Sequence, residues 1–369
     1  LENVLKITPM YKSSLIELYE GIQGVPVRRF ADEPPPRGWG ESLELAFAAA
    51  SLDASANAGR ALVALDLDAD ERPDVARLRA TDDGTLLEIR LAGSLGDAGP
   101  TLPAAGLDRL AAVDLDNDGF VDLIGHGAGA ELRFWRGSEG GRFAEATDEL
   151  GLGGIRARAL AAFDFDSEGD LDLALVDAEG RLELWRNSLE GPLEPVGEQA
   201  FPQLLPRAAE ELLASDLDRD GDTDLLIVHD EGVTWLDNLR QGRFANRTAP
   251  GGLREMPAGL AAASVDLDGD RWPDLLVAGE SGVTLASGNG DQFSPAPLRP
   301  SEASDGPWRS ILPLDLDNDA RLDLALTGPE GTELWQQTAN GWRRAPATFD
   351  TEPASALAAE DLDGDGDLD

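Results

Sequence analysis

The sequence predicts an all-β fold: a β-propeller of four-stranded blades on a seven-blade plan with the last blade truncated, preceded by a short helical N-terminal segment. The first observation behind this prediction is an acidic nine-residue loop that recurs seven times, at intervals of 46 to 52 residues. The second is that short apolar runs flank the loops, as expected for strands buried on both faces. The third is that each period holds two further strand-like segments, so one period makes one blade.

The loops have the form Asp-x-Asp-x-Asp/Glu-x-x-x-Asp, and the clearest copy runs from Asp114 to Asp122. If the chain curls, the carboxylates at positions 1, 3, 5 and 9 converge on one point, and the backbone carbonyl at position 7 adds another oxygen. Four carboxylates this close repel one another unless a cation lies between them. Since a flexible cage made only of oxygen atoms suits Ca²⁺ better than Mg²⁺, the seven loops predict up to seven calcium ions.

The predicted metal ligands are the acidic residues of the seven loops together with the residues at position 7. They are Asp66, Asp68, Asp70, Arg72 and Asp74; Asp114, Asp116, Asp118, Phe120 and Asp122; Asp164, Asp166, Glu168, Asp170 and Asp172; Asp216, Asp218, Asp220, Asp222 and Asp224; Asp266, Asp268, Asp270, Trp272 and Asp274; Asp315, Asp317, Asp319, Arg321 and Asp323; and Asp361, Asp363, Asp365, Asp367 and Asp369.

Position 6 of the loop needs a backbone with φ > 0, and the second, third, fourth and seventh copies have glycine there. Glu71, Arg271 and Ala320 hold this position in the other three copies. A residue with a Cβ adopts the left-handed conformation at some cost, so we expect these three sites to be weaker. In the third loop, Glu168 at position 5 has a longer arm, which is expected to shift the ion.

The spacing excludes two other classes of calcium site. An EF-hand needs a glutamate at position 12 and helices on both sides, but position 12 after Asp114 is Gly125 and the flanks read as strands. These strands are apolar runs such as 110–113 before a loop and 225–228 after one. Calcium arrays that are linked by cysteines are excluded because the chain has no cysteine.

The rest of each period contains a turn, a third strand, a second turn and a fourth strand. The third strand ends in a large apolar residue, namely Trp135, Trp185, Trp235, Leu285 or Trp335. The fourth strand is marked by Phe143, Phe244, Phe293 or Trp342. We interpret the tryptophans as packing between blades; a row of exposed rings for sugar stacking is the alternative.

Residues 1–40 differ from the repeats and hold the only two lysines, Lys6 and Lys12. Thr8-Pro9 reads as a helix start and Gly21 as a helix end, so a helix is expected near 9–20. Pro34, Pro35 and Pro36 then mark a linker. Residues 43–47 alternate apolar and polar residues, as a fourth strand would, and are expected to close the ring beside 356–361. The predicted propeller domain spans 41–369.

The repeated Asp-Leu-Asp-x-Asp-Gly-x-x-Asp-Leu core, the run 184–187 and the segment from Gly242 to Phe244 resemble the FG-GAP/VCBS repeat family over roughly residues 42–369. This family includes the heads of integrin alpha-subunits and many secreted bacterial proteins. The variant here is similar to bacterial proteins with an ASPIC/UnbV tail and to cartilage acidic protein. The integrin-type Gly-Ala-Pro after the second strand is missing, so integrin-like ligand binding is not carried over. The resemblance implies a propeller rigidified by calcium that serves as a binding or scaffold module outside the cytoplasm.

The net charge of −41 disfavours binding to nucleic acid. The sequence contains no run of eighteen apolar residues, so a membrane span is not predicted. Because the chain has no cysteine and therefore no disulfide, bound calcium is expected to stabilise the fold. This expectation favours an extracellular, periplasmic or cell-surface location, where Ca²⁺ is millimolar. The chain begins with Leu and stops at position 9 of the seventh loop, so a secretion signal is expected to be missing from this fragment.

Catalytic residues are not predicted, because the only histidines, His126 and His229, occupy equivalent positions just past a second strand and read as turn residues. The favoured function is a noncatalytic module that binds a protein or polysaccharide through its variable connections, such as 92–108, 189–208 and 296–309. The alternative is a propeller enzyme, resembling a polysaccharide lyase or a dehydratase, or an accessory module of a catalytic domain outside this fragment. A cluster of His, Arg and Tyr at the ring centre would favour the enzyme, and a channel lined by small apolar side chains would favour the binding module.

Overall fold

A computed structural model describes residues 62–92, 99–196, 209–240, 242–290, 292–345 and 356–360. Within these ranges every regular element is a β-strand, and the strands form six four-stranded antiparallel sheets. In each sheet the strands pair in sequence order, so every sheet is one meander and takes about one period of the repeat. The predicted all-β propeller of four-stranded blades is therefore confirmed.

The first three blades have the following strands. They are β1 (Leu62–Leu65), β2 (Asp74–Thr81), β3 (Gly84–Arg90) and β4 (Thr101–Pro103); β5 (Arg109–Val113), β6 (Asp122–His126), β7 (Arg133–Arg136) and β8 (Ala144–Glu145); and β9 (Ala159–Phe163), β10 (Asp172–Val176), β11 (Leu182–Arg186) and β12 (Glu194–Val196).

The last three blades continue in the same order. They are β13 (Ala209–Ser215), β14 (Asp224–His229), β15 (Gly232–Asn238) and β16 (Phe244–Asn246); β17 (Ala261–Val265), β18 (Asp274–Gly279), β19 (Gly282–Gly288) and β20 (Phe293–Leu298); and β21 (Ser310–Leu314), β22 (Asp323–Gly328), β23 (Gly331–Thr338) and β24 (Gly341–Arg344).

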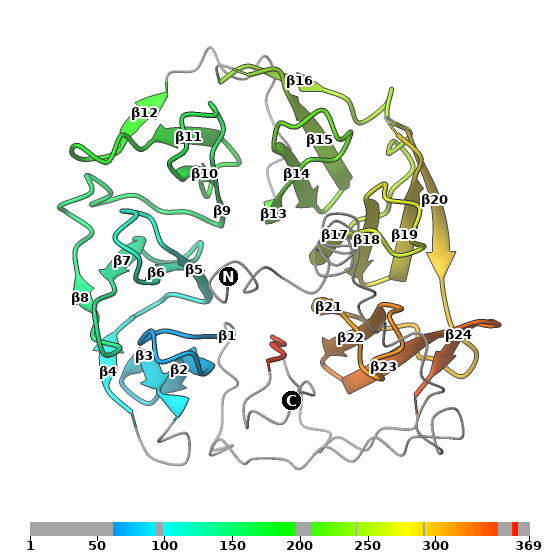
Figure 1. The fold of residues 1–369 in the computed structure, drawn as a ribbon, viewed down its shortest axis with the longest axis horizontal. Coiled ribbons are helices and arrows are strands. Elements are labelled where there is room, and N and C mark those ends of the chain that lie inside the picture. Colours follow the sequence, from blue (N-terminus) through cyan, green and yellow to red (C-terminus); the bar gives the residue numbers. More distant parts are fainter. Residues whose placement is uncertain are drawn as a thin grey trace, which may run out of the picture. The chain divides into compact units, whose positions relative to one another are not determined.

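The six blades follow one another around a common centre, with the first strand of each blade innermost (Figure 1). The inner strands β1, β5, β9, β13, β17 and β21 contact each other in this order. Each Asp loop joins the inner strand of a blade to its second strand, so all the described loops emerge at the same end of the inner strands.

The blade count differs from the prediction: the described residues form six blades, not seven. The segment 356–360 is described, but it pairs with no strand. Its Leu357 and Ala359 pack against a buried cluster of the sixth blade that includes Leu314, Ala325 and Leu334. The predicted helix near 9–20, the linker, the closing strand at 43–47 and the seventh loop lie outside the described residues.

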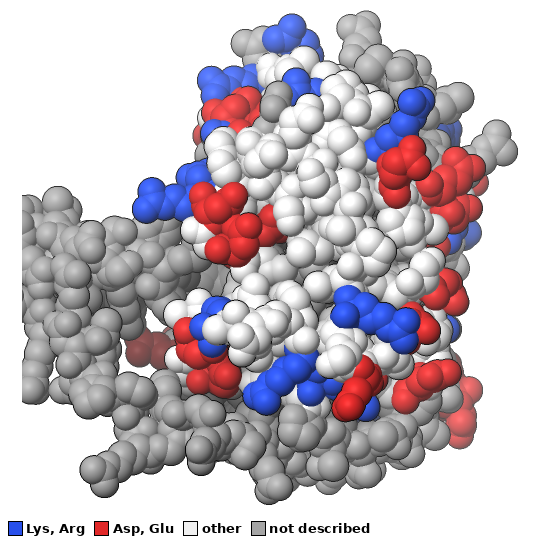
Figure 2. Space-filling view, turned by 90° about the vertical axis from the view of Figure 1, so that its right-hand side faces the viewer, with Lys and Arg blue, Asp and Glu red and all other residues white. Residues whose placement is uncertain are grey.

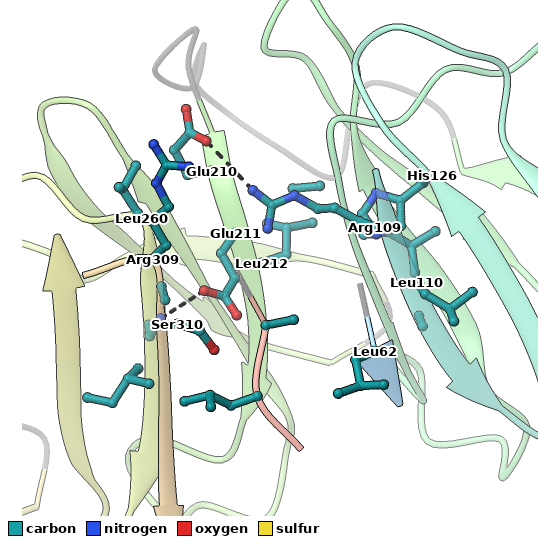
Figure 3. A pocket seen from close by; sticks show the side chains of 18 residues that line it. Leu62, Arg109, Leu110, His126, Glu210, Glu211, Leu212, Leu260, Arg309 and Ser310 are labelled. Atoms are coloured by element: carbon teal, nitrogen blue, oxygen red, sulfur yellow. Dashed lines mark hydrogen bonds and ion pairs between the residues drawn. The ribbon is translucent and has the colours of Figure 1, made fainter. Parts of the chain in front are cut away.

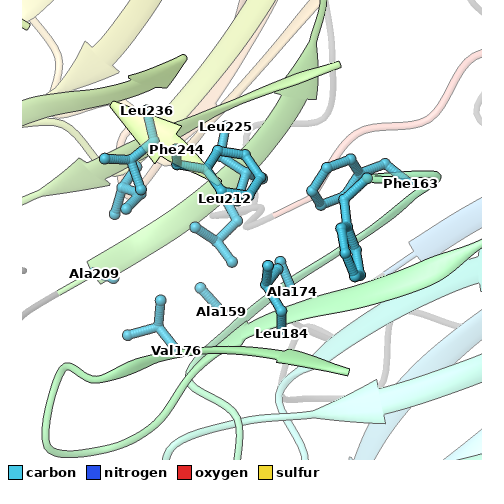
Figure 4. Close-up of a cluster of buried hydrophobic side chains, with 12 residues drawn as sticks. Ala159, Phe163, Ala174, Val176, Leu184, Ala209, Leu212, Leu225, Leu236 and Phe244 are labelled. Carbon is cyan, nitrogen blue, oxygen red and sulfur yellow. The ribbon is translucent and has the colours of Figure 1, made fainter. Parts of the chain in front are cut away.

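The hydrophobic core lies between the blades. One cluster joins the third and fourth blades through residues such as Phe163, Leu212 and Phe244 (Figure 4). Other clusters join each remaining pair of consecutive blades from the first to the sixth. The second strands β6, β10, β14, β18 and β22 are buried along their whole length, as their continuous apolar sequences predict.

The interpretation of the tryptophans as packing between blades is confirmed. Trp135, Trp235 and Trp335 are at most 1% exposed, while Trp185 is partly buried. Trp235 meets Phe293 of the next blade edge to face, with ring centroids 5.6 Å apart, and Trp335 meets Trp308 at 6.0 Å. An aromatic side chain buried in this way contributes a large apolar area and adds about 0.5–1.5 kcal/mol for each edge-to-face pair.

Candidate metal-binding loops

The aspartate at position 9 fixes the end of every described loop. Asp172 is fully buried and is the first residue of β10. Its Oδ2 accepts the N–H of Phe165 at position 2 of the loop (3.2 Å), and its Oδ1 accepts the N–H of Asn187 after the third strand (2.7 Å). The same pair of bonds recurs at Asp74, Asp122, Asp224, Asp274 and Asp323. This carboxylate therefore ties the loop to two strands of its own blade.

The aspartate at position 1 closes the loop from the other end. The carboxylate of Asp114 accepts the N–H of Asp118 (3.1 Å) and the N–H of Gly119 (3.0 Å). Asp118 in turn accepts the N–H of Phe120 at 2.9 Å. The aspartates at positions 1, 5 and 9 are thus backbone acceptors as well as predicted metal ligands, a role that we did not predict from the sequence. The sequence signal for these hydrogen bonds was the spacing of four residues between Asp114 and Asp118 and of two residues between Asp118 and Phe120.

The backbone of the loop passes through the left-handed region twice. At position 6 Gly119 has φ = 90°, and Glu71, Arg271 and Ala320 have φ = 71°, 77° and 67°. The prediction that non-glycine residues adopt this conformation is confirmed, at the expected cost in backbone strain. Position 4 is also left-handed, for example at Asn117 with φ = 56°, and this second turn was missed.

Some carboxylate oxygens inside the loops are buried and accept no hydrogen bond. At position 3 these are Oδ1 of Asp116, Asp166 and Asp317. In other positions they are Oδ1 of Asp170 and Asp216. A buried anionic oxygen without a donor is unfavourable, because it has lost its hydration and gained nothing in return. An oxygen-seeking cation at these atoms would restore the lost interactions, so the donor set fits a hard divalent ion.

Carboxylate oxygens from several positions lie within 4.8 Å of one another in each of the first five loops. The groups are Asp66, Asp68 and Asp70; Asp114, Asp116 and Asp122; Asp164, Asp166, Asp170 and Asp172; Asp216, Asp218 and Asp220; and Asp266, Asp268 and Asp274. Positions 1 and 3 belong to every one of these groups, position 5 or position 9 joins them in different loops, and Asp170 at position 7 joins in the third loop. In these five loops the structure therefore brings together part of the predicted ligand set. Coordination by the remaining acidic residues and by the backbone carbonyls at position 7 stays a prediction.

Burial and mutual repulsion disfavour the charged form of these carboxylates. Burial, with smaller contributions from the carboxylates of Asp166 and Asp170, raises the pKa of Asp172 to about 7, although the N–H groups of Asn187 and Phe165 oppose this shift. Burial likewise raises the pKa of Asp122 to about 6 and that of Asp323 to about 7. A divalent cation in the loop would favour the ionised form and oppose these shifts.

Arginines from the third strand reach the loops in two blades. Arg136 pairs with Asp116 at 2.7 Å, and Arg186 pairs with Asp166 at 2.8 Å. Both aspartates hold position 3, so one oxygen of the carboxylate faces the guanidinium and the other remains for the loop centre. These arginines lie one strand away from their loops, and the sequence pattern did not connect them.

Three side-chain amides link a loop to the next blade. Asn187, in the third blade, donates from Nδ2 to the carbonyl of Leu115 at position 2 of the second loop (2.7 Å). Asn238 makes the same bond to Phe165 (3.1 Å), and Gln337 makes it to Leu267 (3.2 Å). Because the backbone N–H of each amide residue binds the position 9 aspartate of its own blade, one residue connects two consecutive loops.

The prediction that the two histidines are turn residues is wrong. His126 and His229 are the last residues of β6 and β14 and are only 5% and 4% exposed. Nδ1 of His126 lies 3.3 Å from the carbonyl of Ala157, and Nε2 of His229 lies 3.2 Å from Oγ1 of Thr234. Burial, with a smaller effect of Arg109, lowers the pKa of His126 to about 4. β6 and β14 each extend beyond the apolar run that predicted them and include the histidine, so both histidines lie in a strand and are buried.

A family profile described as an FG-GAP-like repeat matches five overlapping segments, residues 114–175, 164–227, 216–277, 266–326 and 315–369. Together they cover more than half of the chain, and each begins at the first aspartate of a loop. A comparison with curated protein sequences found no match. Among the described residues, no helix is long and apolar enough to cross a membrane.

Several solved structures are similar to the chain. An Agrocybe aegerita lectin that recognises non-reducing terminal N-acetylglucosamine is 17% identical, with a TM-score of 0.52 over 80% of this chain and 82% of the lectin. BBS1N, in its complex with ARL6DN, is 10% identical with a TM-score of 0.48 over 82% and 85% of the two chains. The V. cholerae biofilm matrix protein Bap1 is 16% identical, with a TM-score of 0.38 over 64% of this chain and 38% of Bap1. At 17% identity the similarity to the lectin supports only the fold. The TM-scores of BBS1N and Bap1 are below 0.5, so these similarities support no conclusion about this chain.

Proposed function

The chain belongs to the FG-GAP repeat family, and on this premise we propose that it is a calcium-binding propeller that acts as a noncatalytic binding or scaffold module. The observation that carries the proposal is the set of buried carboxylate oxygens without hydrogen-bond donors inside the loops, such as Oδ1 of Asp116 and Asp166. Three of them recur at position 3 of different loops and the others lie in the same loops or in the fourth loop, so a single cause, a bound cation, would account for all of them.

The chemistry of the donors favours calcium. The candidate ligands are carboxylates and, by prediction, backbone carbonyls, and neither histidine nor cysteine takes part. Magnesium demands a near-ideal octahedron, whereas calcium accepts six to eight oxygens in irregular arrangements. The loops differ in which positions converge, and such variation is better tolerated by calcium.

We place the protein in an extracellular, periplasmic or cell-surface compartment. Sites of the extracellular class bind calcium with a Kd of about 10⁻⁴–10⁻³ M. At millimolar Ca²⁺ each such site adds on the order of 1 kcal/mol to stability, and at submicromolar Ca²⁺ it adds almost nothing. A chain without disulfides that depends on many weak sites is suited to the first condition.

A noncatalytic role is supported by the use that the fold makes of its reactive groups. The acidic residues of the loops are engaged in closing the loops, and both histidines are buried with polar contacts. The side of the ring drawn in Figure 2 carries basic residues among the acidic ones, with an uncharged area between them. The net charge of −41 is therefore not spread evenly, and a neutral polysaccharide or a protein can bind there without facing only negative charge.

The test is a calorimetric titration of metal-free protein with Ca²⁺ and with Mg²⁺. We expect several calcium sites with Kd values below a few millimolar, weaker binding of Mg²⁺, and the loss of about one site in Asp166→Asn but not in the exposed control Glu190→Gln. A protein that takes up no calcium at millimolar concentration would contradict the metal assignment. Calcium-loaded protein is then screened against polysaccharides, beginning with glycans that end in N-acetylglucosamine. Release of new reducing ends or unsaturated products would overturn the noncatalytic assignment.

A further inference from the structure

A cavity of about 270 Å³ lies at the centre of the ring, where the inner strands begin (Figure 3). Every described blade contributes to it through its inner strand or the residue before it, and Ala356 and Leu357 contribute beyond the sixth blade. Seven lining residues lie four positions before an Asp loop, and most of them are large and aliphatic. They are Leu62, Leu110, Leu160, Leu212, Ala262, Ile311 and Leu357.

The polar part of the wall comes from the residues that precede this aliphatic ring, together with His126 at the end of β6. Glu210 is already neutralised, because it accepts Arg158 at 2.7 Å and lies 3.7 Å from Arg109. Glu211 is not: its Oε2 accepts one backbone N–H, that of Ala262 at 2.8 Å. Burial raises the pKa of Glu211 to about 7, while that N–H and the charge of Arg109 lower it. The carboxyl group of Glu211 therefore faces the cavity with spare capacity for a donor.

Arg309 supplies the opposite charge. It lines the same cavity just before β21 and is exposed, so its guanidinium is open to solvent, and it takes no part in the ion pairs of Arg109 and Arg158 with Glu210. Ser310 follows it on the cavity wall. Figure 3 shows Glu211 and Arg309 on the same side of the cavity, from β13 and from the strand region that begins at β21. The cavity thus presents one acid with spare capacity for a donor, one exposed base and an aliphatic wall.

We propose that this cavity binds a small zwitterion of the α-amino-acid class. Its ammonium group would donate to Glu211, its carboxylate would accept from Arg309, and an aliphatic side chain would pack against the leucines. The cavity is slightly smaller than the ~300–1,000 Å³ typical of sites for drug-sized ligands, which agrees with a ligand of this size.

Other ligand classes fit the lining less well. A neutral sugar usually stacks on an aromatic ring, and no Phe, Tyr or Trp is among the described residues that line the cavity. A simple anion would leave Glu211 without a second donor, and a simple cation would leave the exposed guanidinium of Arg309 without an acceptor. A ligand with both charges pairs with both groups.

This inference does not depend on the proposed metal sites. The cavity and the loops are separated by about four residues of inner strand, or roughly 13 Å. Calcium binding and ligand binding can therefore be measured on the same sample, and one can fail while the other succeeds.

The experiment is a titration of the calcium-loaded full chain with L-leucine, with leucinamide, which lacks the carboxylate, and with 4-methylpentanoate, which lacks the ammonium group. We expect leucine to bind at millimolar concentration or below, and both analogues to bind about tenfold or more weakly, since each leaves one charged group of the cavity unpaired. Leucine that does not bind at millimolar concentration, or an analogue that binds as tightly as leucine, would overturn the proposal. This comparison uses the unaltered protein and needs no variant.

Variants then assign the contacts. Glu211→Gln and Arg309→Gln should each weaken leucine binding about tenfold or more, and Arg309→Gln should leave the weak binding of leucinamide unchanged. The matched controls are Glu255→Gln and Arg254→Gln, which are exposed and lie away from the cavity lining. Equal binding by Arg309→Gln and Arg254→Gln, with melting temperatures that match, would show that leucine binds elsewhere and would refute the assignment.

Discussion

The amide of Asn187 is predicted to hold two consecutive blades together. Its side chain is buried, with 3% exposure. Nδ2 donates to the carbonyls of Leu115 (2.7 Å) and Leu171 (3.0 Å), and Oδ1 accepts the N–H of Leu189 (3.1 Å). Asn187→Ala removes all three bonds and leaves the carbonyl of Leu115, on the neighbouring blade, without this donor.

The expected loss of stability follows from the number and burial of these bonds. A typical hydrogen bond contributes about 0.5–1.5 kcal/mol, and a buried group left without a partner costs about 1–3 kcal/mol. One buried carbonyl, one partly buried carbonyl and one partly buried N–H give a loss of about 2–4 kcal/mol, which lowers the Tm by about 3–6 °C in a chain of this size. One of the three bonds, that to Leu115, crosses to the second blade, and the other two lie within the third blade.

The assay is thermal and urea unfolding of the calcium-loaded protein, with Asn340→Ala as the control. Asn340 is exposed in the turn between β23 and β24, so its replacement should change the free energy of unfolding by no more than about 0.5 kcal/mol. If Asn187→Ala melts within a degree or two of Asn340→Ala, the amide link does not stabilise the ring and the reasoning is refuted.

Three further predictions concern the loops, the core and the cavity. Chelation of Ca²⁺ should lower the Tm by many degrees, and Asp116→Ala should lose more calcium-dependent stabilisation than Glu71→Ala, as measured by melts with and without chelator; an unchanged melt would reject the role of calcium. Trp235→Ala should destabilise by about 3–5 kcal/mol in urea unfolding, because the ring is fully buried against the next blade, whereas a loss below 1 kcal/mol would contradict this packing. The raised pKa of Glu211 implies stability that is full below its unfolded pKa and is lost as the pH rises through about 7; Glu211→Gln should therefore become more stable than the unaltered protein over that rise, and parallel pH profiles of unfolding would argue against a buried acid there.

The repeated elements could be predicted from the sequence because each is fixed locally. The loop closes through aspartates within nine residues of one another, and the second strands are continuous apolar runs such as 225–228, which must be buried on both faces. Because the same pattern occurs seven times, one period of the repeat could be identified as one blade. The prediction also included a truncated seventh blade, whereas the described residues form six blades.

The parts of the site that the sequence did not predict are those made between strands. Arg136 reaches Asp116 from twenty residues further along the chain, and Asn187 reaches Leu115 from 72 residues away. Nothing in the spacing of Arg136 or Asn187 along the sequence distinguishes these residues from the other arginines and asparagines of the chain. His126 was misplaced for a related reason: a residue at the end of an apolar run reads as a turn, although the strand carries it inward.

The amide links suggest how the loops of different blades depend on one another. Where the third, fourth and sixth blades have Asn187, Asn238 and Gln337, the second and fifth have Gly137 and Gly288, whose N–H groups still bind the position 9 aspartate but which have no side chain to reach the preceding loop. The amide bridge therefore joins the second and third loops and the third and fourth, whereas the fourth and fifth loops meet through Arg219, whose guanidinium donates to the carbonyl of Arg271. If calcium orders a loop, its effect should pass more strongly to a directly bridged neighbour than to a loop two blades away. Loss of calcium at the third loop in Asp166→Asn should then increase amide hydrogen exchange in the second and fourth loops more than in the fifth, and an increase of the same size in all of them would show that the ring responds as one unit.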